Sequence, residues 1–145
     1  MWYLIGMWFR DQLKAMMGCA ARELNIPVST IPQTVFRNTN AEASAYCMGS
    51  NRLIIDRDSR IPKLLAFIWF HELYHWVQFE VDKRPYPHHF YDNTSVYNDE
   101  QYMQFWAEKQ ANAFALHMCE KYGFDWVTPI WLTEDYMKEI RDYVW

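Results

Sequence analysis

The stretch that most constrains the fold is an almost unbroken apolar run, residues 61–79, which contains two histidines and a glutamate. In IPKLLAFIWFHELYHWVQF, a proline stands near the start and apolar side chains surround the helical axis instead of forming one stripe. A helix of this kind is expected to be buried on every side. The run therefore predicts a central helix, with His71, Glu72 and His75 inside the protein.

These three residues form the pattern H-E-x-x-H. Residues four apart lie on one face of a helix, so both imidazoles can point at one cation about 2.0–2.1 Å from each. A zinc ion held there lowers the pKa of a bound water, and Glu72 is placed to take its proton. Without a metal, burying two imidazoles and a carboxylate costs several kcal/mol, unless hydrogen bonds in the core satisfy them.

A catalytic zinc site usually has three protein ligands and one open position, so a third ligand is expected from elsewhere in the chain. Glu108 lies on a second long helix, whereas His88 and His89 lie in a polar, proline-containing loop predicted for residues 82–98. A helix holds a ligand more rigidly than a loop does. Asn112, one turn beyond Glu108, lies on the same face and can orient a ligand. We expect Glu108, with the loop histidines as the alternative.

The segment HELYH and the later segment EKQANAFALHM resemble the ImmA/IrrE family of small zinc metallopeptidases, which pair H-E-x-x-H with a helix of the form E-x-x-A-N-x-F-A. The positions that match this helix are Glu108, Ala111, Asn112, Phe114 and Ala115. The resemblance covers about residues 43–118. It implies a zincin-like fold, one zinc ion bound by His71, His75 and Glu108, and Glu72 as general base. It also implies a peptidase that, in relatives, often acts on regulatory proteins of phages and mobile elements.

Two other functions are compatible with the same motif. The segment PHHF, residues 87–90, resembles the loop of SprT-like metallopeptidases, in which a histidine after H-E-x-x-H is the third ligand. The domain could also bind zinc without cleaving anything, as a regulatory or toxin–antitoxin module. The intact Glu72 argues against such a module, because binding alone needs no base at that position.

The rest of the first half predicts one helix and a small sheet. Residues 2–24 have apolar residues at helical spacing. The segment QTVFR, residues 33–37, has the composition of a short strand. The β-prone runs 43–48 and 52–56 flank a Gly-Ser-Asn turn, which is typical of a hairpin.

The second half predicts two further helices. One runs from about residue 99 to residue 122 and ends at Gly123, a residue type favoured just after a helix. The other begins after Thr133, which can cap it. The chain of 145 residues is long enough for one domain with a sizeable core. We therefore expect a single α+β domain over residues 1–145, with an N-terminal helix, a small sheet or hairpin, the active-site helix and further C-terminal helices.

Composition narrows the partners and the compartment. The net charge is −4 and no basic stripe is present, so nucleic-acid binding is not expected. No run approaches the roughly 20 apolar residues that a membrane span needs. The three cysteines, Cys19, Cys47 and Cys119, form no disulfide framework. We expect a cytoplasmic zinc metallopeptidase with a protein or peptide substrate.

Overall fold

The computed structural model describes residues 2–38, 44–47, 49–60, 62–126 and 132–145. Most of these residues are helical, and a small sheet lies beside the helices, so the fold belongs to the predicted α+β class. The helices and strands are α1 (Trp2–Leu24), β1 (Gln33–Arg37), β2 (Ala45–Cys47), β3 (Arg52–Asp56), α2 (Pro62–Trp76), α3 (His88–Tyr91), α4 (Asp99–Gln104), α5 (Trp106–Tyr122) and α6 (Glu134–Arg141).

The three strands form one sheet in the order β1–β3–β2. β2 and β3 are antiparallel, with Tyr46 opposite Leu53, which confirms the predicted hairpin. Residues 43 and 48 of the first predicted run lie outside the described residues. β1 runs parallel to β3 on its other side, a pairing that the sequence pattern did not predict. This order leaves β2 at an edge of the sheet.

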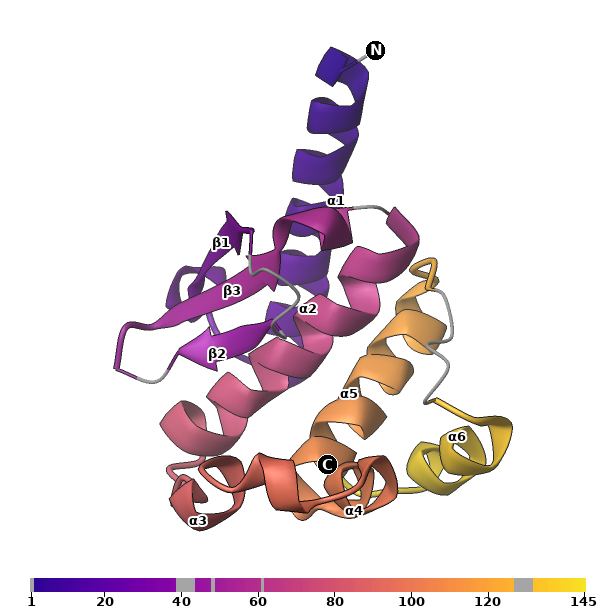
Figure 1. Ribbon diagram of the computed structural model, residues 1–145. Helices are drawn as coiled ribbons and strands as arrows, with labels where there is room; N and C mark the ends of the chain where they lie inside the picture. Colours follow the sequence, from indigo (N-terminus) through magenta and orange to yellow (C-terminus); the bar gives the residue numbers. More distant parts are fainter. Residues whose placement is uncertain (1, 39–43, 48, 61, 127–131) are drawn as a thin grey trace.

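α2 lies between the sheet and α5 in the middle of the molecule (Figure 1). Its core side chains are fully buried and include Leu65, Trp69, Phe70 and Leu73. Each such side chain contributes about 1.5–3 kcal/mol through its removal from water. The central buried helix is therefore confirmed, although residue 61 lies outside the described residues. After Trp76 the helix widens into a π-helical turn, Val77–Val81.

One prediction is wrong: the single helix expected over about 99–122 is two helices, α4 and α5. The residue between them, Phe105, has an extended backbone (φ −61°, ψ 136°). Its ring stacks on the ring of Phe90, with centroids 3.7 Å apart. We attribute the break to this aromatic contact. The ring of Phe105 stacks on Phe90 with the Phe105 backbone extended, and an extended residue interrupts a helix. Gly123 ends α5 in the left-handed conformation (φ 72°), as predicted.

The predicted loop over residues 82–98 is partly helical. It contains α3 and a 3-10 turn, Thr94–Val96, because the buried side chain of Phe90 anchors α3 to the domain. The predicted start of the last helix is confirmed, since the hydroxyl of Thr133 accepts a hydrogen bond from the backbone N–H of Tyr136.

The N-terminal helix α1 is also confirmed, and its first part extends beyond the rest of the molecule (Figure 1). Met16 and Ala20 of its second half are fully buried in the core. Glu23, near its end, accepts hydrogen bonds from His117 and Lys121 of α5. Among the described residues, no helix is long and apolar enough to cross a membrane.

Candidate metal centre

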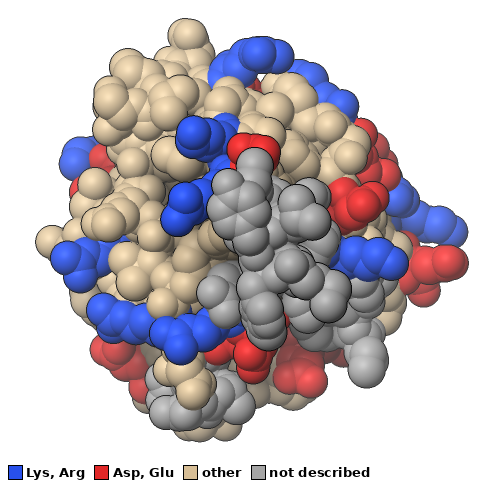
Figure 2. Space-filling model, turned by 90° about the horizontal axis from the view of Figure 1, so that it is seen from above, with Lys and Arg blue, Asp and Glu red and all other residues tan. Residues whose placement is uncertain are grey.

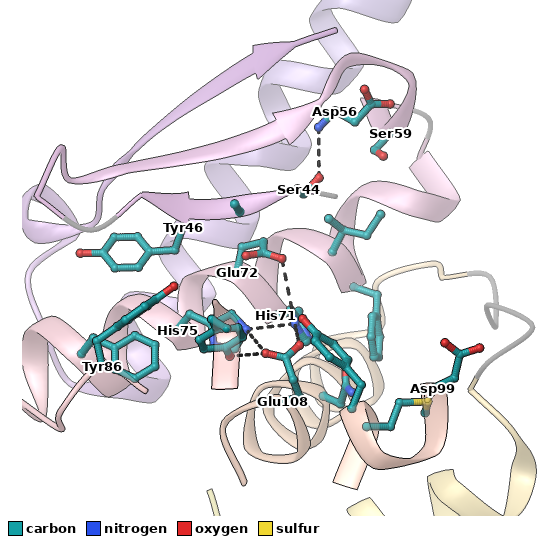
Figure 3. A pocket seen from close by; sticks show the side chains of 18 residues that line it. Ser44, Tyr46, Asp56, Ser59, His71, Glu72, His75, Tyr86, Asp99 and Glu108 are labelled. Carbon is teal, nitrogen blue, oxygen red and sulfur yellow. Dashed lines mark hydrogen bonds and ion pairs between the residues drawn. The ribbon is translucent and has the colours of Figure 1, made fainter. Parts of the chain in front are cut away.

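Three side chains from two helices meet beside the sheet (Figure 3). His71 and His75 point from α2 toward Glu108, which lies in the first turn of α5. Nε2 of His71 is 3.2 Å from Oε1 of Glu108, and Nε2 of His75 is 3.0 Å from Oε2. The two Nε2 atoms are 3.2 Å apart. Within the described part of the chain, no other group of three His, Cys, Asp or Glu side chains is arranged to hold a metal ion.

These distances suit a tetrahedral zinc ion. An ion about 2.0–2.1 Å from each ligand atom separates the ligand atoms by about 3.3 Å. The Nε2–Nε2 distance and the distance from each Nε2 to a Glu108 oxygen lie close to that value, with the two histidines facing different oxygens of the carboxylate. Two imidazole nitrogens and one carboxylate are also a known ligand set of catalytic zinc. The three side chains can therefore hold one zinc ion.

The packing of α2 against α5 explains why these side chains meet. Ala107, Ala111 and Ala115 recur at four-residue spacing on α5 and are fully buried. Their small side chains allow the backbones of two helices to approach closely. Glu108, next to the first of these alanines, is thereby brought against the face of α2 that carries the histidines.

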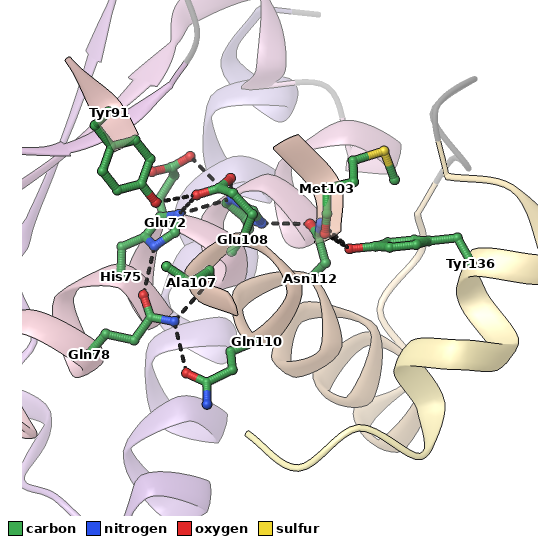
Figure 4. Close-up of polar contacts among 11 residues, drawn as sticks. Glu72, His75, Gln78, Tyr91, Met103, Ala107, Glu108, Gln110, Asn112 and Tyr136 are labelled. Atoms are coloured by element: carbon green, nitrogen blue, oxygen red, sulfur yellow. Dashed lines mark hydrogen bonds and ion pairs between the residues drawn. The ribbon is translucent and has the colours of Figure 1, made fainter. Parts of the chain in front are cut away.

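The ring orientation of His71 is set by a chain of hydrogen bonds (Figure 4). Its Nδ1 lies 2.7 Å from Oδ1 of Asn112. The Asn112 amide donates through Nδ2 to the hydroxyl of Tyr136 (3.1 Å), which donates to the carbonyl of Met103 (2.8 Å). Oδ1 of Asn112 therefore accepts the proton of Nδ1, which leaves Nε2 of His71, the nitrogen that faces Glu108, as the atom that can bind a metal ion. Ligand histidines in metal sites typically have such a partner.

His75 has an equivalent partner in Gln78, whose Oε1 lies 2.9 Å from Nδ1 of His75. Sequence reasoning missed Gln78. A signal was present, however, because Gln78 is a polar residue inside the apolar segment that follows His75, and it is buried.

The charges of the pair His75 and Glu108 depend on each other. Burial alone lowers the pKa of His75, but the Glu108 carboxylate outweighs burial and raises that pKa to about 9. Burial alone raises the pKa of Glu108, but the adjacent His75 and His71 outweigh it and hold that pKa well below its ordinary value. Without a metal, Glu108 is therefore ionised and His75 carries a proton at neutral pH. A metal ion must displace that proton to bind.

Glu72 lies beside the three candidate ligands without joining them. Its Oε1 is 4.0 Å from Nε2 of His71, too far for a hydrogen bond. The carboxylate is buried and lies near the backbone N–H of Tyr46 on β2. Burial raises the pKa of Glu72 above its ordinary value. A carboxylate with a raised pKa at this position is suited to take up and return a proton.

The segment after α2 contributes a tyrosine to the site, and its histidines do not line it. His88 and His89 are exposed on α3 and are absent from the lining of the cavity at the site. Tyr91, on the same short helix, lines the cavity and donates a hydrogen bond to Oε2 of Glu108. The structure thus brings Glu108, and not the loop histidines, to the pair His71 and His75.

The site opens into a cavity of about 690 Å³. Tyr46 and Tyr86 lie toward one end of it and Asp99 toward the other (Figure 3). On the molecular face seen in Figure 2, side chains of both charge signs are dispersed over the surface. Apart from the protonated His75, by contrast, the charged residues that line the cavity are all acidic: Asp56, Glu72, Asp99 and Glu108. The cavity therefore favours the approach of cations.

Comparison of the chain with protein-family models, with curated proteins and with solved structures gives no match. The family that the two sequence motifs resemble therefore stays a prediction, and the case for a function rests on the site itself.

Proposed function

We propose that the chain is a zinc-dependent metallopeptidase with a zincin-like fold that binds one zinc ion through His71, His75 and Glu108. The observation that carries this proposal is the convergence of these three side chains, with the buried carboxylate of Glu72 4.0 Å from Nε2 of His71. This arrangement provides a ligand set and, beside it, a base that is not itself a ligand. The resemblance to ImmA/IrrE metallopeptidases supports the same assignment.

Zinc, when bound, supplies a Lewis acid that acidifies a water molecule and polarises a carbonyl group. Glu72 takes one proton from the attacking water as its oxygen bonds to the carbonyl carbon of the peptide. The same carboxyl group then gives that proton to the nitrogen as the carbon–nitrogen bond breaks, so that a carboxylic acid and an amine are formed. The remaining proton of the acid passes to the amine or to solvent, which leaves a carboxylate. The raised pKa of Glu72 suits both transfers.

A peptide is the substrate that the walls of the cavity favour. Ser44, Ala45 and Tyr46, in and next to the edge strand β2, line the cavity. An extended peptide can add to the edge of a sheet through backbone hydrogen bonds. In this way the reacting carbonyl would lie near Glu72, which Tyr46 contacts through its backbone N–H. A regulatory protein with an extended segment is the substrate that the family resemblance supports.

We place this activity in the cytoplasm. Cys19, Cys47 and Cys119 are all free thiols, and free thiols are typical of a reducing compartment.

The geometry favours a metallopeptidase with this ligand set over the two alternative functions, a SprT-like peptidase and a zinc-binding module without activity. A SprT-like site requires a loop histidine, yet His88 and His89 are exposed and do not line the cavity. A module that binds zinc without hydrolysis has no use for Glu72, whose burial as a carboxylate costs free energy.

The test is a comparison of Glu72→Gln with the wild type, both loaded with zinc, on a mixture of unfolded peptides. We expect the wild type to cleave peptides and the variant to keep its zinc while losing about 10²–10⁴-fold in rate. Glu100→Gln, an exposed change outside the cavity lining, is the matched control and keeps the wild-type rate. Cleavage by Glu72→Gln at the wild-type rate would remove the general base from the proposal. A zinc-loaded wild type that cleaves nothing would favour the binding module.

A further inference from the structure

Gln78 is buried in the π-helical turn Val77–Val81, with 1% of its surface exposed. A glutamine side chain has one accepting oxygen and two N–H donors, and a buried one needs partners for them. Oε1 lies 2.9 Å from Nδ1 of His75, and Nε2 donates to the backbone carbonyl of Ala107 (2.9 Å) and to Oε1 of Gln110 (3.1 Å) (Figure 4). Every polar atom of this side chain therefore has a partner.

These partners determine which way the Gln78 amide points. The carbonyl of Ala107 can only accept, so the NH₂ group must face it and Oε1 must face His75. Nδ1 of His75 therefore carries the proton of this hydrogen bond. Its other nitrogen, Nε2, is then the atom left to bind an ion between His75, His71 and Glu108.

The same side chain joins the two helices that carry the ligands. Ala107 directly precedes Glu108 in α5, so Gln78 contacts a ligand histidine of α2 and also the backbone next to the ligand of α5. Asn112 makes the reciprocal contact, from α5 to His71 of α2. The two amides lie on opposite sides of Glu108 (Figure 4).

The wide turn after α2 places Gln78 for this task. The N–H of Asp82 donates to the carbonyl of Val77, five residues earlier, at 2.8 Å. Such π-helical turns are rare and often occur at functional sites. This turn starts directly after α2, so Gln78, three residues after His75, reaches both His75 and α5.

We propose that Gln78 is a positioning residue of the metal centre: it holds His75 for binding through Nε2 and keeps the first turn of α5 where Glu108 reaches the same ion. The inference rests on the proposed zinc site and is independent of whether the protein cleaves peptides.

The experiment measures zinc affinity by competition with a chelator, using Zn²⁺ alone as the probe. Gln78→Leu removes every hydrogen bond of the side chain and weakens zinc binding by about 10–100-fold, the usual effect of losing a partner of a ligand histidine. Gln78→Glu keeps an oxygen that accepts from Nδ1 of His75 but loses the donor to Ala107, so it recovers part of the affinity. The control is Glu100→Gln, an exposed change outside the cavity lining that keeps the wild-type affinity.

Nitrogen NMR of the zinc-loaded proteins supplies a second readout, because it identifies the His75 nitrogen that binds zinc and follows the proton on the other nitrogen. In the wild type and in Gln78→Glu, His75 binds through Nε2 and its Nδ1 proton exchanges slowly with water. In Gln78→Leu that proton exchanges faster. If Gln78→Leu matches the wild type in zinc affinity and in the exchange rate of the Nδ1 proton, the role of Gln78 is overturned and the proposed function is not. A Gln78→Glu variant that binds zinc no better than Gln78→Leu would have the same consequence. A wild type that binds no zinc would overturn both this inference and the proposed function.

Discussion

Oε2 of Glu108 lies 3.0 Å from Nε2 of His75, so the first turn of α5 meets the last turn of α2 at the candidate metal centre. Neither helix alone carries a complete ligand set. An ion bound there therefore holds the two helices together, and it stabilises the folded chain by an amount that grows with its free concentration.

The identity of the third ligand follows from this contact. We expect Glu108→Ala to lose most of its zinc affinity, because two histidines alone leave the site without its carboxylate. We expect the double change His88→Ala with His89→Ala to bind zinc like the wild type, because both side chains are exposed on α3. Zinc titrations followed by thermal unfolding measure both variants. Retained binding in the first variant and lost binding in the second would favour a SprT-like site.

Zinc affinity should depend on pH with a definite sign. His75 has a pKa of about 9 in the metal-free protein, so below that pH its proton must leave before zinc binds. Each pH unit below 9 therefore weakens binding about tenfold for one displaced proton. Competition with a chelator of known affinity, from pH 7 to 8.5, measures the slope. His89→Gln, an exposed change, should keep that slope, and an affinity constant over this range would contradict the prediction.

Tyr91 should support zinc binding through Glu108. Burial and the Glu108 carboxylate raise the pKa of Tyr91, so its hydroxyl stays a hydrogen-bond donor. Tyr91→Phe removes that donor, and we expect zinc affinity to fall by about tenfold, at the lower end of the usual effect of such partners.

The control for this prediction is Tyr86→Phe. Tyr86 lines the same cavity, and its ring centroid is 5.3 Å from that of Tyr91. We expect this change to leave zinc affinity unaltered in the same chelator competition. Equal losses in the two variants would show that the contact with Glu108 has no special role.

Glu23 should stabilise the fold in a pH-dependent way. Burial alone raises its pKa, but hydrogen bonds from Lys121, His117 and Tyr122 outweigh burial and lower that pKa from 4.5 to about 2. The contribution of the charged form is therefore complete above pH 4.5 and is lost as the pH falls toward 2. We expect Glu23→Gln to lower the free energy of unfolding by about 1–2 kcal/mol at pH 7, and by less at pH 3.

Denaturant unfolding at the two pH values measures the Glu23 effect. Glu120→Gln is the control, because it removes an exposed pair with Arg141, and such pairs contribute about 0–1 kcal/mol. A Glu23→Gln deficit that is as large at pH 3 as at pH 7 would show that the carboxylate charge is not responsible.

Local sequence patterns predicted much of the fold. Such patterns reflect interactions within one or two helical turns, and these interactions can be read from neighbouring residues. The helical spacing of apolar residues predicted α1 and α2, and the cap residues Thr133 and Gly123 marked helix ends where the structure has them. The break at Phe105 and the parallel pairing of β1 with β3 were not predicted. Both depend on contacts with residues distant in sequence, such as Phe90, which no local pattern reveals.

The candidate site divides in the same way. The spacing of His71 and His75 placed both on one helical face, and the family-like motif pointed to Glu108. Gln78 and Tyr91 were not assigned, because their roles depend on how the π-helical turn and α3 pack against α5. A spacing rule describes one helix, whereas these contacts are made between elements.

The most direct test of the metal centre is anomalous diffraction at the zinc absorption edge from crystals grown with zinc. We predict one strong peak per chain, about 2.0–2.1 Å from Nε2 of His71, Nε2 of His75 and a carboxylate oxygen of Glu108. No peak between these side chains, or a peak bound by His88 or His89 in place of Glu108, would contradict it.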